Sequence, residues 1–175
     1  SGSLPLEAAL LASNHAPGLL SRDFGFQRWT DFDASLWNEL LEEAETAQRE
    51  LPVNLVFGSD RDKRAVDLAR RNAESAGIGA KVRWSYNDFA KLEAPGDHGT
   101  LICNPPYGER IGEEAELEAF YRKIGDTFKQ NWKGWTAWVF TGNLALAKRV
   151  GLKASRRIVL FNGPIECRLL KYELY

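Results

Sequence analysis

The sequence predicts an α/β fold with a mostly parallel sheet that is closed by an antiparallel hairpin. Beyond residue 50, short apolar segments alternate with longer segments whose apolar residues recur at helical spacing. This alternation is typical of parallel sheets covered by helices. Near the carboxyl end, residues 156–161 and 166–174 flank the turn sequence Asn162-Gly163-Pro164, which predicts the hairpin. A length of 175 residues suits one domain with a hydrophobic core.

The first 50 residues are predicted to be helical at both ends, with a loop between the helices. Residues 4–13 are rich in Leu and Ala and predict a short buried helix. Residues 14–30 contain Pro and Gly and predict a loop. Either Asp33 or Ser35 can cap the next helix, which runs to about residue 50.

The remaining chain supplies the sheet and its covering helices. Strands are expected at residues 53–57, 81–86, 100–103 and 136–140. Helices are expected at residues 62–76, 114–131 and 143–150. Ligands of such sheets bind at the carboxyl ends of the strands. Asp60, Asp88 and Asn104 are therefore expected along one rim.

The overall charge argues against a domain that grips nucleic acid by itself. The formal net charge is −1, whereas autonomous RNA-binding domains are usually basic. Residues 148–157 are the exception, because they contain five Lys or Arg residues and no acid. Two interpretations of this segment stay open: a solvated surface, or an edge that contacts phosphates.

The remaining totals predict a cytoplasmic protein without a metal site. No apolar segment approaches the roughly 20 residues that a membrane span requires, and the chain does not open with a signal peptide. Cys103 and Cys167 match no metal-ligand spacing, and two isolated cysteines suit a reducing compartment.

Asn104-Pro105-Pro106-Tyr107 is the strongest chemical signal. An exocyclic amine on a nucleobase is a poor nucleophile, because its lone pair is delocalised into the ring. The Asn104 side-chain oxygen and the Pro105 carbonyl can each accept one of its N–H groups, which favours a tetrahedral nitrogen. The two prolines stiffen the loop, and Tyr107 offers a face on which a flipped base can stack. Methyl transfer to such an amine requires alignment rather than a general base.

Several polar residues are candidates for binding an adenosyl cofactor. Asp60 can bind both ribose hydroxyls, although it can instead cap the following helix, and Asp62 can exchange roles with it. Asn87-Asp88 can read the adenine ring, but such a pair is also common in turns. Ser1-Gly2-Ser3 enters a helix at once, where the cofactor's charged amino-acid end or its ribose can lie.

Together these segments resemble the ribosomal-RNA large-subunit guanine-N2 methyltransferases, over nearly the whole chain. Residues 1–9 resemble the second half of the family's first cofactor motif, residues 58–62 its ribose motif and residues 104–110 its catalytic motif. Residues 162–169 are similar to its closing hairpin, which DNA adenine methyltransferases lack. The resemblance implies a Rossmann-like class I methyltransferase sheet, S-adenosyl-L-methionine as cofactor and guanine N2 of 23S ribosomal RNA as target.

The chain departs from this family at its amino terminus. The first strand and the opening Asp-Pro-x-x-Gly of the cofactor motif are missing, and Gly2 and Asp60 are separated by the family-type insertion 14–50. Residues 1–175 are therefore expected to be a single, partial catalytic domain. An upstream segment is expected to supply the strand and the RNA-binding THUMP domain that the family usually carries.

Two other functions remain open. A protein glutamine-N5 methyltransferase faces the same problem of a poorly nucleophilic amide, but the closing hairpin and the insertion argue against it. A non-catalytic RNA- or partner-binding domain of the same fold is the other alternative. The complete Asn104-Pro105-Pro106-Tyr107 tetrad argues against it.

Overall fold

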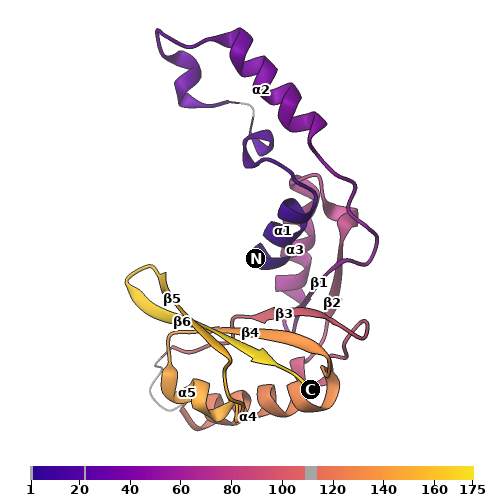
Figure 1. Cartoon of the computed structure of the whole chain (residues 1–175), viewed down its shortest axis with the longest axis vertical. Coiled ribbons are helices and arrows are strands. Elements are labelled where there is room, and N and C mark those ends of the chain that lie inside the picture. Colours follow the sequence, from indigo (N-terminus) through magenta and orange to yellow (C-terminus); the bar gives the residue numbers. More distant parts are fainter. Residues whose placement is uncertain (1, 22, 109–113) are drawn as a thin grey trace. The chain divides into compact units, whose positions relative to one another are not determined.

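The computed structural model of the chain describes residues 2–21, 23–108 and 114–175 (Figure 1). It forms two compact units, Ser1–Asn87 and Asp88–Tyr175, and each is described by itself. Predictions that concern Ser1, Glu109 and Arg110 lie outside the described residues.

The first unit is a small parallel sheet with two helices. Its strands β1 (Val56–Asp60) and β2 (Val82–Tyr86) pair in parallel, so both end at the same edge. Helix α3 (Lys63–Ser75) connects them, and α1 (Ser3–Ala12) contacts both strands. The buried core of this unit consists of Ala9, Leu10, Leu51, Ala73, Ile78 and Val82.

Residues 14–48 form an insertion in the first unit. The Arg49 N–H donates to the Ser13 carbonyl at 2.7 Å, and the Asn14 side chain donates to the Ala47 carbonyl at 2.9 Å. These hydrogen bonds bring the two ends of the insertion together. It contains 3₁₀ turns at Pro17–Leu20 and Gly25–Arg28, and helix α2 (Ala34–Thr46). Its aromatic side chains pack on one another: Phe24, Phe26, Trp29, Phe32 and Trp37.

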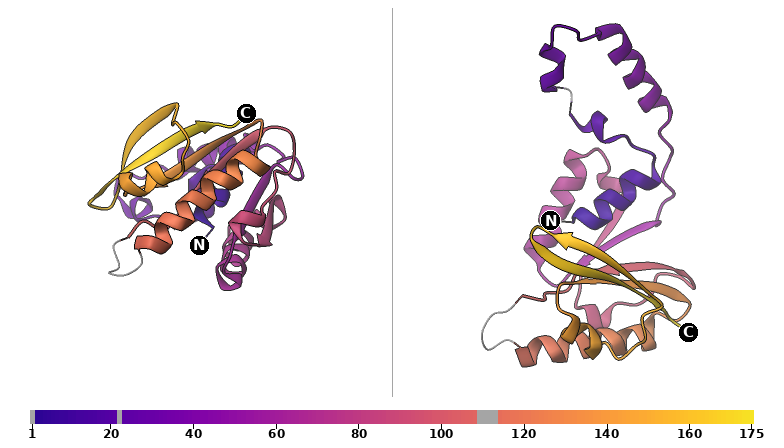
Figure 2. Two further views of the ribbon diagram at one scale, coloured as in Figure 1. Left: turned by 90° about the horizontal axis from the view of Figure 1, so that it is seen from below. Right: turned by 60° about the vertical axis from the view of Figure 1, so that its left-hand side comes forward.

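The second unit is a four-stranded sheet in the order β3-β4-β6-β5. Its strands are β3 (Gly99–Cys103), β4 (Trp135–Thr141), β5 (Arg156–Asn162) and β6 (Ile165–Glu173). β3 and β4 are parallel, while β6 is antiparallel to both β4 and β5. Helices α4 (Glu114–Asn131) and α5 (Leu144–Arg149) lie on one face of this sheet (Figure 2).

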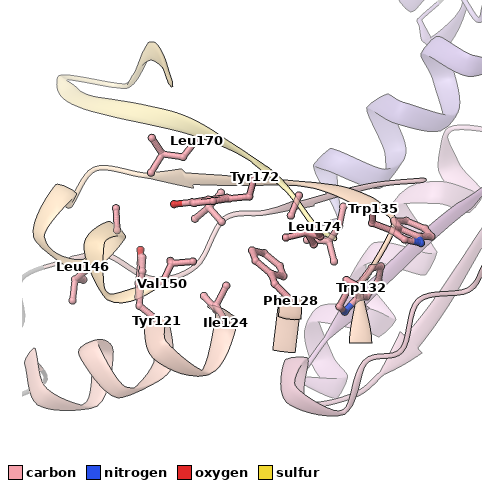
Figure 3. Packing of buried hydrophobic residues seen from close by; sticks show 14 residues of the cluster. Tyr121, Ile124, Phe128, Trp132, Trp135, Leu146, Val150, Leu170, Tyr172 and Leu174 are labelled. Carbon is pink, nitrogen blue, oxygen red and sulfur yellow. The ribbon is translucent and has the colours of Figure 1, made fainter. Parts of the chain in front are cut away.

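The core of the second unit lies between that face and α4. Tyr121, Ile124 and Phe128 project from α4 toward the sheet and are almost fully buried (Figure 3). They recur at three- and four-residue intervals, which places them on one side of the helix. The Tyr121 hydroxyl forms a buried hydrogen bond of 2.8 Å with Thr141 at the end of β4. This bond satisfies a polar group that would otherwise be costly to bury.

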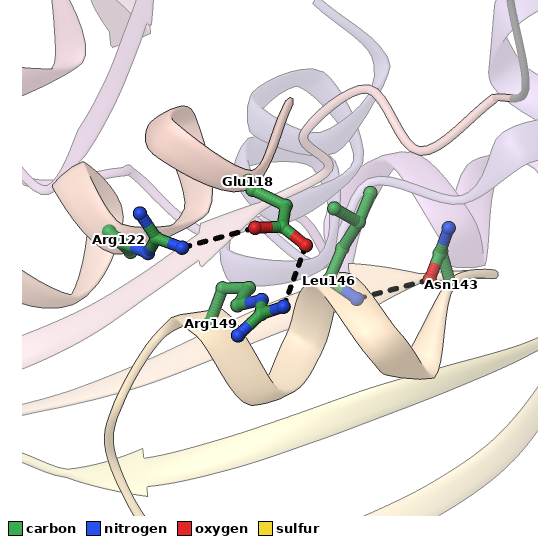
Figure 4. A network of polar contacts seen from close by, with 5 residues as sticks. All are labelled: Glu118, Arg122, Asn143, Leu146 and Arg149. Carbon is green, nitrogen blue, oxygen red and sulfur yellow. Dashed lines mark hydrogen bonds and ion pairs between the residues drawn. The ribbon is translucent and has the colours of Figure 1, made fainter. Parts of the chain in front are cut away.

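An ion pair between Glu118 of α4 and Arg149 links helix α5 to α4. Glu118 accepts from Arg149 of α5 at 2.8 Å and from Arg122 of its own helix at 3.0 Å (Figure 4). Asn143 caps α5 by accepting from the Leu146 N–H. Arg149 is thus engaged within the unit. The other basic residues of segment 148–157 are exposed: Lys148, Lys153, Arg156 and Arg157.

The α/β prediction and its closing hairpin are confirmed, with one strand misplaced. The strand expected at residues 53–57 instead covers Val56–Asp60. Asn54 has a φ of 65°, a left-handed conformation that interrupts extended backbone, and its side chain accepts from Arg83 at 3.0 Å. The strand therefore begins after this turn and continues through Gly58.

Candidate active site

The two strands of the first unit bring Asp60 and Asn87 together. Asp60 ends β1, and its register partner Tyr86 ends β2. The Asn87 N–H donates to the Asp60 carbonyl at 3.0 Å, which fixes the two strand ends side by side. This unit therefore confirms that Asp60 lies at the carboxyl edge of a parallel pair.

Asp60 and Asp62 have different local roles. Asp62 is the residue that caps α3, because its carboxylate accepts from the Arg64 N–H at 2.8 Å. Asp60 accepts from the Asp62 N–H at 2.9 Å through Oδ1 only. Its Oδ2 accepts from no described residue, and the residue is exposed. The capping alternative thus applies to Asp62, which leaves Asp60 an oriented carboxylate with an unused oxygen.

The first turn of α1 lies against the same strands. Gly2 precedes the helix with a φ of 73°, and a Cβ there would lie 2.5 Å from Ala69 Cβ and 2.7 Å from Trp84. Gly58 of β1 also packs on the Trp84 ring, where a Cβ would lie 2.4 Å away. Only glycine fits at this position, because another residue would be strained at the positive φ and its Cβ would clash with Ala69 and Trp84. The start of α1, where Ser3 is the first helical residue, therefore lies against Trp84 of β2, and Gly58 of β1 packs on the same ring.

Asp88 begins the second unit and is engaged locally. It accepts from the Ala90 N–H at 3.0 Å and pairs with Lys123 of α4 at 3.3 Å. The Ala90 hydrogen bond, followed by Lys123, lowers the pKa of this carboxyl below its ordinary value. Both side chains are about half exposed, so solvent screens this ion pair and makes it weak.

Asn104-Pro105-Pro106-Tyr107 follows β3 directly, as predicted. Pro105 is buried and anchors the loop, whereas Asn104 is exposed. The Asn104 side chain has no hydrogen bond to any other described residue, so its oxygen is available to a substrate. Burial raises the pKa of the preceding Cys103 thiol to about 12, which keeps it neutral beside the loop.

Tyr107 is held by residues that the sequence did not indicate. Its hydroxyl accepts from the Asn162 side chain at 2.8 Å and contacts the Cys167 thiol at 3.7 Å. Its ring packs edge-on against Phe140, with centroids 6.3 Å apart. The sequence marks Asn162 only as part of the turn and of the segment that resembles the family's closing hairpin, and nothing in it links Asn162 to a residue 55 positions earlier.

The candidate residues thus form two groups, one in each unit. Gly2, Asp60, Asp62 and Asn87 belong to the first, and Asp88 and the Asn104–Tyr107 loop belong to the second. Among the described residues, no three His, Cys, Asp or Glu side chains are placed to hold a metal ion. No helix in the described ranges has the length and apolar character needed to cross a membrane.

Comparison with known proteins gives a family. A family model for an RMKL-like methyltransferase domain matches residues 1–171. The RNA methyltransferase named slr0064 from Synechocystis sp. is 48% identical over the whole chain, which covers 46% of that relative. A ribosomal RNA large subunit methyltransferase K/L from Syntrophotalea carbinolica is 42% identical over 99% of the chain, which covers 25% of it.

A solved structure shows the same fold. The methyltransferase SMU.472, crystallised in complex with SAH, has a TM-score of 0.89 and 30% sequence identity to the chain. The match covers 99% of the chain and 45% of that structure. The chain spans less than half the length of each of these proteins. With both the sequence motifs and this fold in agreement with the matching model, the chain belongs to the family of RMKL-like methyltransferase domains.

Proposed function

We propose that the chain transfers a methyl group from S-adenosyl-L-methionine to guanine N2 in 23S ribosomal RNA. The observation that carries the proposal is the Asn104–Tyr107 loop, which follows a parallel strand and presents an exposed Asn104 whose side chain has no hydrogen-bond partner among the described residues. The relatives named as RNA and ribosomal RNA methyltransferases support RNA as the substrate class.

The residues of the first unit fit the proposed cofactor. A carboxylate that ends a strand suits a ribose diol, and Asp60 has an unused oxygen there. The start of α1 suits the carboxylate of the amino-acid end, because the dipole of a helix favours an anion at its amino terminus. Asn87 and Asp88 are the candidates for the adenine. When bound, S-adenosyl-L-methionine supplies a methyl group made electrophilic by its sulfonium.

The loop of the second unit prepares the nucleophile. Asn104 Oδ1 and the Pro105 carbonyl accept the two N–H groups of the amine, which localises its lone pair on nitrogen. Both acceptors also stabilise the positive charge that the nitrogen gains as the methyl group arrives, and the methylated amine then releases one proton to solvent. Tyr107 stacks on the base and sets the angle at which the lone pair meets the methyl carbon.

Methyl transfer from labelled S-adenosyl-L-methionine to unmodified ribosomal RNA tests the proposal. With the full-length protein, label is expected in N2-methylguanosine after digestion to nucleosides. Label in another nucleoside would contradict the assignment to guanine N2 but not the assignment to RNA methylation. Label in protein glutamine would favour the amide-methylating alternative, and absence of both label and cofactor binding would favour a binding domain.

The ribose assignment predicts different effects for two neighbouring acids. Asp60→Asn is expected to weaken S-adenosyl-L-methionine binding about 10-fold to 100-fold, because a charged hydrogen bond to the ribose is lost. Asp62→Asn is the matched control, since asparagine also caps helices well and should preserve binding. Calorimetric titration of the full-length variants measures both. A larger loss with Asp62→Asn would reverse the assignment.

We further propose that chain outside residues 1–175 completes the sheet and supplies the grip on RNA. Among the described residues, β1 pairs only with β2 and β3 only with β4, so each strand has one open edge. An open edge leaves backbone N–H and C=O groups of the strand without a partner in the sheet. The small net charge also fits a domain that relies on another for RNA affinity.

Hydrogen exchange in the full-length protein tests this completion. All backbone amides of β1 and β3 are expected to be protected, including those that point away from β2 and β4. In a parallel pair with one open edge, only alternate amides are bonded. Protection of alternate amides alone would show that these edges remain open.

A further inference from the structure

Tyr107 sits on an irregular loop, yet three elements of regular structure hold its ring. Asn162, at the end of β5, donates to its hydroxyl at 2.8 Å, and Cys167 of β6 lies 3.7 Å from the same oxygen. Phe140 of β4 meets the ring at an interplanar angle of 87°. The ring is only partly buried, so one portion stays accessible.

Gly142 adds a backbone surface under the ring. A Cβ at this position would lie 2.9 Å and 3.0 Å from Cε2 and Cδ2 of Tyr107, and 3.1 Å from Ile165 Cγ2. The φ of Gly142 is not in the left-handed region, so space rather than backbone conformation requires glycine here. The ring therefore lies directly against the backbone that follows β4.

The contacts to the hydroxyl come from one face of the closing hairpin. Asn162 pairs with Ile165, and Cys167 pairs with Leu160, so these four side chains share a face. β6 is in turn hydrogen-bonded to β4 along six residue pairs. The hydroxyl is thus tied to the sheet, while the loop that carries Tyr107 has no regular structure.

We infer that Asn162 is a positioning residue for methyl transfer, which fixes the Tyr107 ring, with Gly142 behind it, as a preset platform for the target base. The inference rests on the proposed function, because it concerns how that site orients its substrate. A side chain that is ordered before binding loses less entropy when the base stacks on it. Without Asn162 the ring can rotate away, and the amine meets the methyl group less often in line.

The ionisation of Tyr107 supports orientation rather than proton transfer. The Asn162 hydrogen bond lowers its pKa, but burial and the Cys167 thiol raise it by more, so the pKa lies above the ordinary value. The phenol is therefore neutral at physiological pH. Its ring, and not a phenolate, is what Asn162 holds in place.

A double-mutant cycle in the full-length protein tests the inference. Asn162→Ala and Tyr107→Phe remove opposite partners of one hydrogen bond, so each is expected to lower kcat about tenfold with little change in the KM for S-adenosyl-L-methionine. The double variant is expected to be no slower than either single variant. Val159→Ala, on the exposed opposite face of β5, is the control and should keep full activity.

Multiplicative losses in the double variant, or a kcat for Asn162→Ala equal to that of the parent, would overturn the inference. A second readout does not depend on methylation. Titration of ¹³C-labelled tyrosine is expected to show a higher Tyr107 pKa in Asn162→Ala, since the donor that favours the phenolate is gone. An unchanged pKa in a protein that methylates RNA overturns the inference alone. If Asn162→Ala raises the Tyr107 pKa but the parent protein methylates no RNA, the proposed function is overturned, while the hydrogen bond that holds Tyr107 is confirmed.

Discussion

Replacing Asn104 by alanine in the full-length protein is expected to lower kcat for RNA methylation by about 10²-fold to 10³-fold. In the proposed mechanism the side-chain oxygen stabilises the amine as its charge develops, and removing one such preorganised group typically costs this much. The effect should fall on kcat, because the interaction strengthens only as the nitrogen becomes tetrahedral. Single-turnover kinetics with saturating RNA and cofactor measure it.

Two features of Asn104 make the experiment clean. The residue is exposed and has no hydrogen bond to another described residue, so alanine should change the free energy of unfolding by less than about 0.5 kcal/mol. Asn104→Asp is the matched variant, because it keeps an acceptor oxygen at the same position and should retain more activity than alanine. An alanine variant within threefold of the parent would exclude Asn104 as the group that activates the amine.

The sequence predicted the regular elements because their signals are local. The helix expected at residues 114–131 is α4 with the same bounds, since its apolar positions recur at three- and four-residue intervals. The strand at residues 53–57 was misplaced for a reason that is also local. Apolar residues lie on both sides of Asn54, so the sequence suggests one continuous strand. Only the structure shows that Asn54 has a left-handed backbone conformation, which interrupts the strand.

The site was predictable where a strand end or a motif marked it. Asp60 is the last residue of β1 and Asn104 directly follows β3, and both were predicted at strand ends. The choice between Asp60 and Asp62 as helix cap needed coordinates, because either spacing permits a cap. Asn162 could not be found, since its partner Tyr107 is brought to it by the pairing of distant strands.

Gly125 is a second residue whose importance no local pattern reveals. It lies in the middle of α4, where helix propensity alone favours alanine over glycine by about 1 kcal/mol. In the structure, a Cβ at Gly125 would lie 1.8 Å from the Val150 carbonyl oxygen and 2.8 Å from its carbon. These are backbone atoms at the end of α5, so no side-chain rotation relieves the clash.

Gly125→Ala is therefore expected to destabilise the protein by about 3 kcal/mol or more, in spite of its helix propensity. Relief of the clash requires α5 to move away from α4, which breaks the Arg149–Glu118 ion pair and exposes Val150, now 1% accessible. Gln130→Ala, at an exposed position of the same helix, is the control and should stay within about 0.5 kcal/mol of the parent. Urea unfolding of the full-length variants gives both values. A Gly125→Ala protein as stable as the Gln130→Ala protein would mean that the two helices do not approach as closely in solution, because only that close approach opposes the gain in helix propensity.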